Sequence, residues 1–165
     1  MKIDLDVQYS DVDERGLPHA AQFHEWAVCA LEEAGVEDTG SELGIVVRVV
    51  GTSEMLSLNH QFRNKAKVTN VLSFPFEAIA GIDYEHLGDI VICAQVVEDE
   101  SKDQGKEIVA HWAHLLIHGI LHLLGLDHIE DEEAKEMEAL ERRIMGVLNY
   151  RDPYESPGLT HAIQR

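Results

Sequence analysis

The pattern of hydrophobic and polar positions divides the 165-residue chain into short regular segments. Four segments alternate apolar and polar residues or are rich in β-branched residues, and these predict strands at 2–8, 44–51, 70–76 and 87–95. Five segments place apolar residues at helical spacing and predict helices at 20–35, 54–63, 96–104, 107–124 and 131–148. The last three helices follow the last strand. We therefore expect a single α+β domain over residues 1–165, with a mixed sheet of about four strands packed with about five helices.

Turn and cap residues refine these boundaries. Gly35 and Gly125 follow helical segments, where glycine commonly ends a helix. Thr52 or Ser53 is expected to cap the helix at 54–63, because a hydroxyl oxygen can accept a hydrogen bond from a free backbone N–H. Pro75 cannot donate to a sheet ladder, so the strand at 70–76 is expected at an edge. Residues 77–85 are expected to form a loop.

Charge changes this picture in one region. The chain has 31 acidic residues against 13 Lys and Arg, and its net charge of -18 argues against nonspecific binding to nucleic acid or anionic lipid. Between residues 43 and 76, however, the only acid is Glu54, and the cations there are Arg48, Arg63, Lys65 and Lys67. This locally basic stretch is either a solvated loop or a site for an anion.

Composition also bounds the cellular context. Cys29 and Cys93 form no CxxC pair and no disulfide framework, so no disulfide partners are expected. The first ten residues have no hydrophobic signal core, and no apolar run approaches the roughly 20 residues of a membrane span. We expect a cytoplasmic protein with no membrane partner.

The segment HGILHLLGLDH, residues 118–128, places three histidines in an apolar helix and the turn after it. His118 and His122 are four residues apart, so they share one helix face at the spacing that lets two imidazoles bind one metal. Gly125 can reverse the chain and bring His128 to the same point. Three imidazoles with one open position are typical of a catalytic zinc site, so the pattern predicts one Zn²⁺ per chain, with other divalent metals possible.

Two alternatives to three histidine ligands stay open. Each histidine could instead be a core residue paired with a backbone carbonyl or a carboxylate, since an unpaired buried imidazole is costly. His111 and His114 lie on a similar helix face and are expected to pack or to support the ligands, with His114 as the substitute ligand. The spacing H-x3-H-x2-G-x2-H also resembles that of the metzincin proteases. Those enzymes carry a general-base Glu after the first histidine, where this chain has Gly119, so proteolysis is disfavoured.

Several blocks of the sequence together resemble the YbeY family, whose members are metal-dependent endoribonucleases acting in ribosomal RNA maturation. The blocks are FRNKAKVTNVLSFPFE, LGDIVIC, AHLLIHGILHLLGLDH and the acidic helix IEDEEAKEMEALE, in the order the family has them. The resemblance runs from about Gly44 to Tyr154. One difference is Leu126, where the family commonly has Tyr.

The resemblance implies a single-strand-directed, metal-dependent endoribonuclease that acts in late-stage ribosome quality control and in 3′-end maturation of small-subunit (16S) rRNA. Ribosomal RNA and the small ribosomal subunit would be its partners. It also implies that Arg63 is needed for activity, which fits the basic stretch, because a guanidinium suits a phosphate oxygen. Either water or the RNA 2′-hydroxyl would be the nucleophile.

Further contacts are expected around these residues. Lys65 and Lys67 would bind substrate phosphates, and Ser73 would contact the substrate backbone from an edge strand. Asp127 or Asp89 would orient a ligand imidazole. Two other functions stay open: a non-catalytic ribosome-assembly factor with a structural metal, and a metal-dependent hydrolase of another substrate class.

Overall fold

The protein is described by a computed structural model over residues 1–76, 86–126 and 130–155. Four strands form one mixed sheet in the spatial order β1-β2-β4-β3. β1, β2 and β4 run parallel, and β3 is antiparallel to β4. β3 is therefore an edge strand, as its proline predicted. The strands are β1 (Ile3–Ser10), β2 (Leu43–Val50), β3 (Val71–Pro75) and β4 (His86–Cys93).

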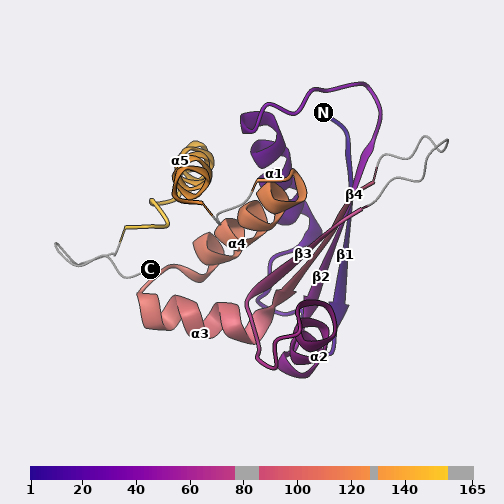
Figure 1. The fold of residues 1–165 in the computed structure, drawn as a ribbon, viewed down its shortest axis with the longest axis vertical. Coiled ribbons are helices and arrows are strands. Elements are labelled where there is room, and N and C mark those ends of the chain that lie inside the picture. The colour runs from indigo at the N-terminus through magenta and orange to yellow at the C-terminus, as the bar shows by residue number, and fades with distance from the viewer. Residues whose placement is uncertain (77–85, 127–129, 156–165) are drawn as a thin grey trace.

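Five helices within the described ranges pack around this sheet, which confirms the expected α+β domain with a mixed four-stranded sheet (Figure 1). No helix in this part of the chain is long and apolar enough to cross a bilayer. The helices are α1 (Ala20–Glu33), α2 (Thr52–Arg63), α3 (Ala94–Gln104), α4 (Ile108–Leu123) and α5 (Asp131–Val147).

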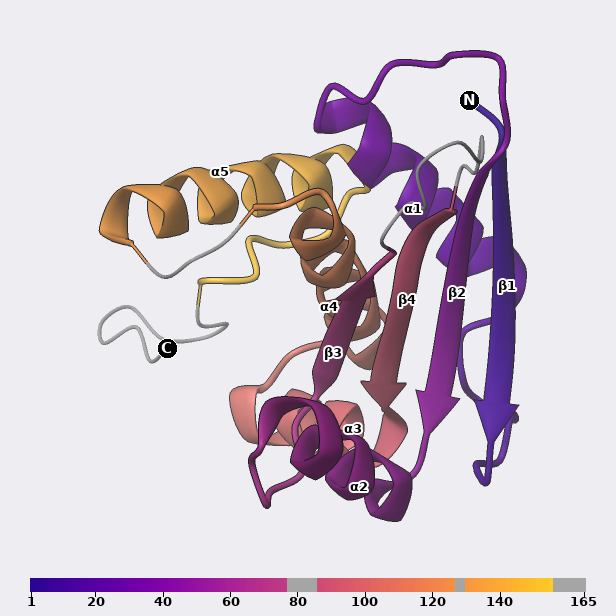
Figure 2. The same cartoon turned by 45° about the vertical axis from the view of Figure 1, so that its right-hand side comes forward.

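The larger hydrophobic core lies between the sheet and helices α1 and α4. Phe23 of α1 packs edge-on against Trp26, with ring centroids 5.6 Å apart, and against Trp112 of α4 at 6.0 Å. α5 covers the outer side of α4, as Figure 2 shows, and buries Met137 and Ile144 there. Because α4 is covered on two sides, nearly its whole circumference is buried. Any polar side chain on it must therefore find a partner inside the protein.

A smaller core lies on the opposite face of the sheet, beneath α2, where Met55 packs against Leu72 and Val91. Successive side chains of a strand point to opposite faces. Along β3, Ser73 therefore faces α4, whereas Phe74 faces α2. The two faces of this edge strand thus belong to two different layers of the molecule.

α4 approaches the sheet closely at Gly119. A Cβ atom at this position would lie 3.0 Å from Ile90 Cγ2 and 3.2 Å from Ser73 Oγ, tighter than ordinary van der Waals contact. The absence of a side chain lets α4 pack directly on β3 and β4. A glutamate here, as in the metzincin pattern, would press against the Ile90 and Ser73 side chains, which would have to shift.

Some predicted boundaries were wrong. α2 begins at Thr52 with Gly51 as its N-cap, so neither Thr52 nor Ser53 caps it. β4 ends at Cys93 and α3 begins at once, although the apolar pattern predicted a strand to residue 95. Gly35 and Gly125 both have positive φ, at 81° and 91°, as expected for residues that reverse the chain after a helix. The predicted loop at 77–85 lies outside the described residues.

Candidate functional site

His118 and His122 lie one turn apart on α4 and line the same cavity. Their Nε2 atoms are 3.0 Å apart, and their ring centroids 4.6 Å apart. The structure therefore brings these two predicted ligands together. The third, His128, lies outside the described residues, and within the described ranges no group of three His, Cys, Asp or Glu side chains gathers to hold a metal.

A buried carboxylate on α5 holds one of these histidines. Glu141 has no exposed surface, and its Oε1 lies 2.7 Å from Nδ1 of His118. Its Oε2 lies 2.7 Å from Nε2 of His114. The α4–α5 packing thus places a single charge between two imidazoles of one helix.

The protonation state of Glu141 fixes the tautomers of its partners. Burial alone would raise the pKa of Glu141, but the hydrogen bonds from His114 and His118 outweigh it and lower that pKa to about 2. An ionised carboxylate only accepts hydrogen bonds, so His118 Nδ1 and His114 Nε2 must each carry a proton. When His118 is neutral, its Nε2 therefore keeps a lone pair on the side that faces His122 and the cavity.

The C-terminal segment completes this arrangement. The hydroxyl of Tyr154 donates to Oε2 of Glu141, and its ring lies 5.4 Å from that of His114. Burial and the negative charge of Glu141 raise the pKa of Tyr154, so the hydroxyl stays protonated and remains a donor. Arg142 lies over the Tyr154 ring at 5.2 Å and bonds to Asp152, which ties this segment to α5.

The two earlier histidines of α4 are also paired with carboxylates. His114 is 9% exposed and bound to Glu141, and burial lowers its pKa, so it donates as a neutral imidazole. His111 Nε2 lies 2.9 Å from Oε1 of Glu100 on α3. The His114 ring lies 6.3 Å from that of His118, and the His111 ring lies 6.4 Å from that of His114.

Glu141 is the residue that sequence analysis missed. Its partners are 23 and 27 residues away along the chain, so no local spacing connects them. A weaker signal was present in α5, whose buried positions 137, 141, 144 and 145 are apolar except for this one acid. A charge on a buried helix face must be paired, which is the pattern that could have identified it.

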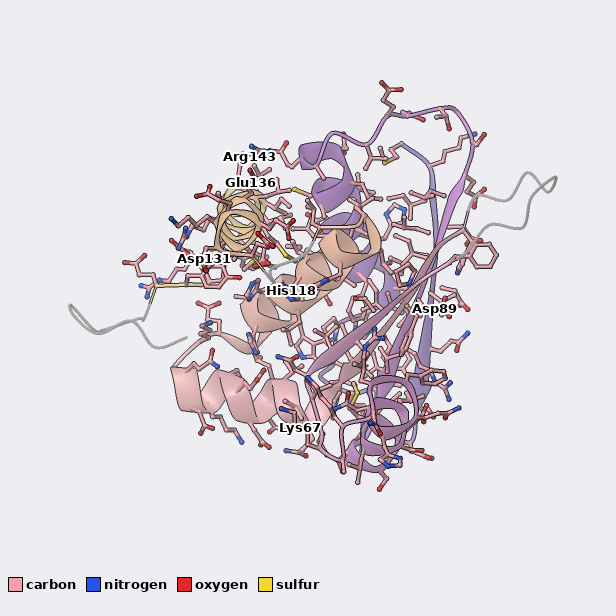
Figure 3. All side chains as sticks on the ribbon, viewed as in Figure 1. Lys67, Asp89, His118, Asp131, Glu136 and Arg143 are labelled. Carbon is pink, nitrogen blue, oxygen red and sulfur yellow. The ribbon has the colours of Figure 1, made fainter. Side chains whose placement is uncertain are left out.

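Of the two carboxylates named for this role from the sequence, Asp89 does not perform it. Asp89 bonds to His86 at 3.0 Å, and it pairs across the sheet with Phe74 on the α2 side. It therefore lies across the sheet from His118, as Figure 3 shows, and cannot orient an α4 imidazole. Asp127 lies outside the described residues.

The predicted substrate residues line the same cavity as the two histidines. The cavity has a volume of ≈ 490 Å³. One wall is the outer edge of β3 and the segment before it, and the other is the α4 face. Its predicted site residues are Arg63, Lys65, Lys67, Ser73, His118 and His122.

Arg63, the last residue of α2, is held against β3 from the side. Its Nη2 donates to the carbonyl of Ser73 at 2.8 Å, and its guanidinium lies 5.3 Å from the centre of the Phe74 ring. Asn64 then adopts a left-handed conformation, with φ 56°, and turns the chain out of the helix. These contacts aim a planar cation at the cavity and use only one of its five N–H donors for the strand.

The lysines that follow are placed by a buried side chain. Asn59 is 2% exposed, and its Nδ2 donates to the carbonyl of Lys67 at 2.8 Å. The backbone N–H of Lys65 donates to the carbonyl of Asn59 at 3.3 Å. The loop is therefore anchored to α2, although both lysine side chains are exposed.

We call residues 55–76 the basic segment, because this run of the sequence contains no acidic residue. Within the described part of the chain, Arg63, Lys65 and Lys67 form no ion pair. Arg48 lies before this run and is paired with Glu54 at 2.8 Å. The positive charge at the cavity is therefore uncompensated, in a protein whose net charge is -18.

Ser73 has a structural contact as well as a place in the cavity wall. Its hydroxyl donates to the carbonyl of Gly119 at 3.1 Å, which links β3 to α4. Its oxygen can still accept a hydrogen bond.

A second cavity, of ≈ 500 Å³, is lined by His111 and His114. Its wall carries charges of both signs, among them Lys106 and Glu107. The Lys106 ammonium donates to the carbonyl of Pro153 at 2.7 Å and so fixes the C-terminal segment. Neither His118 nor His122 lines this cavity. The converging Nε2 atoms of these two histidines belong to the first cavity, which is therefore the candidate site.

Comparison with known proteins agrees with this picture. The family model described as "Endoribonuclease YbeY" matches residues 8–149. The solution structure of TM1509 from Thermotoga maritima superposes with a TM-score of 0.55 at 21% sequence identity, covering 94% of this chain and 99% of that chain. That likeness concerns the fold.

Cys29 and Cys93, both within the described residues, are free thiols.

Proposed function

Since the chain belongs to the YbeY family of endoribonucleases, we propose that it is a zinc-dependent, single-strand-directed endoribonuclease. We place its action in late-stage ribosome quality control and in 3′-end maturation of small-subunit rRNA, in the cytoplasm, with the small ribosomal subunit as its partner. The observation that carries the proposal is the shared cavity. Converging imidazole nitrogens lie there beside uncompensated Arg and Lys side chains.

The residues present fit a zinc ion. Adjacent ligands of a tetrahedral zinc with Zn–N near 2.0–2.1 Å lie about 3.3–3.4 Å apart, close to the 3.0 Å between the Nε2 atoms of His118 and His122. The carboxylate on the opposite nitrogen of His118 matches the usual support of a zinc-bound imidazole. In the proposal, His118, His122 and His128 hold one ion, which supplies Lewis-acid activation of water and of a phosphoryl oxygen when bound.

The chain's own side chains perform the remaining tasks. Arg63 has guanidinium N–H groups left for a phosphoryl oxygen and neutralises charge that develops there during cleavage. Lys65 and Lys67 bind phosphates further along the strand. The Oγ of Ser73 accepts a hydrogen bond from the substrate backbone. These roles are the same whether water or the RNA 2′-hydroxyl attacks phosphorus.

Charge distribution favours RNA over other substrates of a metal hydrolase. All 31 acids lie outside the basic segment, so a polyanion is attracted to this cavity more strongly than to the rest of the protein. Gly119 lacks the general base that the related histidine spacing uses in proteases, and a side chain at this position would press against Ile90.

A nuclease assay tests the proposal. A small-subunit rRNA fragment with single-stranded and duplex parts is incubated with the protein, beside a protein substrate, before and after chelation and zinc restoration. We expect cuts in single-stranded RNA that chelation abolishes and zinc restores. RNA left intact under all conditions while the zinc is bound would favour the assembly factor. Cleavage of the protein substrate alone would favour another hydrolase.

A further inference from the structure

An exposed aromatic ring lies next to the cavity, on the other side of β3. Phe62 is 51% exposed, although full burial of a phenyl ring is strongly favourable. Its ring centroid lies 5.2 Å from that of Phe74, in an edge-to-face contact. A single exposed apolar residue needs no explanation, so the inference depends on what surrounds this one.

Arg63 connects the ring to the cavity. It lies over Phe74 at 5.3 Å and donates to Ser73, so it reaches around the edge of β3 from the α2 side to the α4 side. Phe74 is already contacted by the guanidinium and by Phe62. Phe62 is therefore the ring of this cluster that a ligand can reach.

The surrounding charge selects the class of ligand. Phe62 belongs to the basic segment, and the unpaired cations Arg63, Lys65 and Lys67 follow it within five residues. An exposed aromatic ring beside uncompensated cations is the combination that binds single-stranded nucleic acid, since the cations hold phosphates and the ring stacks on a base. A base in a duplex is already stacked, so only an unpaired base can use the ring.

We infer that Phe62, supported by Phe74, forms a subsite that stacks an unpaired base of the RNA, next to the phosphate bound by Arg63. This inference rests on the proposed function and deepens it, because the subsite gives the enzyme a physical preference for single strands. The RNA then crosses the edge of β3, with one nucleotide on the α2 side and the cut bond on the α4 side.

Binding is tested without cleavage, in chelator, with a single-stranded oligoribonucleotide, its duplex, and copies that lack one base at each position in turn. Phe62→Ala should weaken single-strand binding about tenfold, within the range of one base–aromatic stack, and leave duplex binding unchanged. Phe62→Tyr should bind like the parent. Leu56→Ala is the matched control, because Leu56 is a 40% exposed apolar residue of the same helix without a ring.

The base-free copies locate the contact. In the parent, removing one particular base should cost about as much as Phe62→Ala, and in Phe62→Ala the same removal should cost nothing further. Phe62→Trp adds a direct signal, because the native Trp26 and Trp112 are 2% and 1% exposed. The new indole emission should be quenched by the single strand and not by the duplex.

The outcomes separate the subsite from the enzyme. If the parent binds and cuts single strands while Phe62→Ala, Leu56→Ala and all base-free copies behave alike, the subsite is wrong and the proposed function stands. If the parent binds no single-stranded RNA, both the subsite and the proposed endoribonuclease function are wrong. If Phe62→Ala weakens binding to the intact small ribosomal subunit but not to naked RNA, the ring contacts protein and the subsite is overturned.

Discussion

The two walls of the cavity differ in the burial and in the pairing of their polar groups. The α4 wall is backed by a buried network, in which Glu141 of α5 pairs with His114 and His118. The basic segment is exposed, and its cations have no carboxylate partners among the described residues. A buried, paired network holds atoms in fixed positions, which suits metal binding. Exposed, unpaired cations keep their charge available, which suits phosphate binding. Mutations in the two walls should therefore have separable effects.

The largest effect is expected from the histidines. His118→Ala removes a proposed ligand and leaves Glu141 with one imidazole partner fewer. Zinc affinity should fall by more than the ~10–100-fold typical of losing a supporting group, and RNA cleavage should fall to background. His128→Ala should also lose most of the zinc and lower the Tm in zinc-containing buffer, because metal binding orders the turn after α4. Zinc titration and thermal melting, with and without chelator, measure both. Identical Tm values for His128→Ala and the parent under both conditions would show that the metal does not stabilise the fold.

The next largest effect is expected at Arg63. Arg63→Ala should reduce RNA cleavage by ~10²–10³-fold, the usual loss for a group that stabilises transition-state charge, with little change in zinc content or Tm. Arg63→Lys should recover only part of the rate, because an ammonium lacks the planar pair of donors. Arg48→Ala is the control, since Arg48 is a neighbouring cation already paired with Glu54. A parental cleavage rate for Arg63→Ala that is still chelator-sensitive would exclude a catalytic part for this residue.

A smaller effect, on the other wall, is expected at Glu141. Glu141→Gln keeps the size of the side chain but turns one acceptor into a donor that faces an imidazole N–H. We expect ~10–100-fold weaker zinc binding and about 1–3 kcal/mol lower stability. Competition with a zinc indicator and denaturant unfolding measure the two losses. Unchanged zinc affinity would mean that Glu141 supports only the packing of α4 and α5.

The stability difference at Glu141 should also depend on pH. Its pKa in the folded protein is about 2, below the usual 4.5. The stabilisation is therefore complete above pH 4.5 and is lost as the pH falls from 4.5 toward 2. In chelated protein, the gap in unfolding free energy between the parent and Glu141→Gln should narrow between pH 7 and pH 3. A gap that widens on acidification would show that the carboxylate is not held ionised.

The smallest effects are expected at the exposed lysines. Lys65→Ala and Lys67→Ala should each weaken RNA binding several-fold and lower the slope of log affinity against log salt by about 0.7, the value for one phosphate contact on a single strand. Zinc content and Tm should match the parent. If both variants keep the parental salt slope, these lysines do not contact phosphates, and the loop is only a solvated loop.

The sequence predicted one of the two walls better than the other. The basic segment and the α4 histidines are local patterns, visible as a run without acids and as an i, i+4 pair, so their members could be named in advance. The network behind His118 depends on α5 packing against α4, and no local spacing brings Glu141 to a partner 23 residues away.

The error at Asp89 has a related cause. It was named as a possible partner of a ligand imidazole, but strand alternation turns it to the α2 face. The elements themselves were predictable because their periodicity is local. The order of the strands, with β4 between β2 and β3, is fixed by long-range pairing that periodicity does not encode.

The central claim is that the α4 wall binds the metal and the basic segment binds RNA. It is tested most directly by measuring both properties in His118→Ala and in Arg63→Ala. Zinc content of the purified proteins is measured by elemental analysis, and single-stranded RNA affinity is measured in chelator on the same preparations. We predict that His118→Ala loses zinc and retains RNA affinity, whereas Arg63→Ala retains zinc and binds RNA more weakly. If each variant loses both properties together, the two walls do not act separately and the account is contradicted.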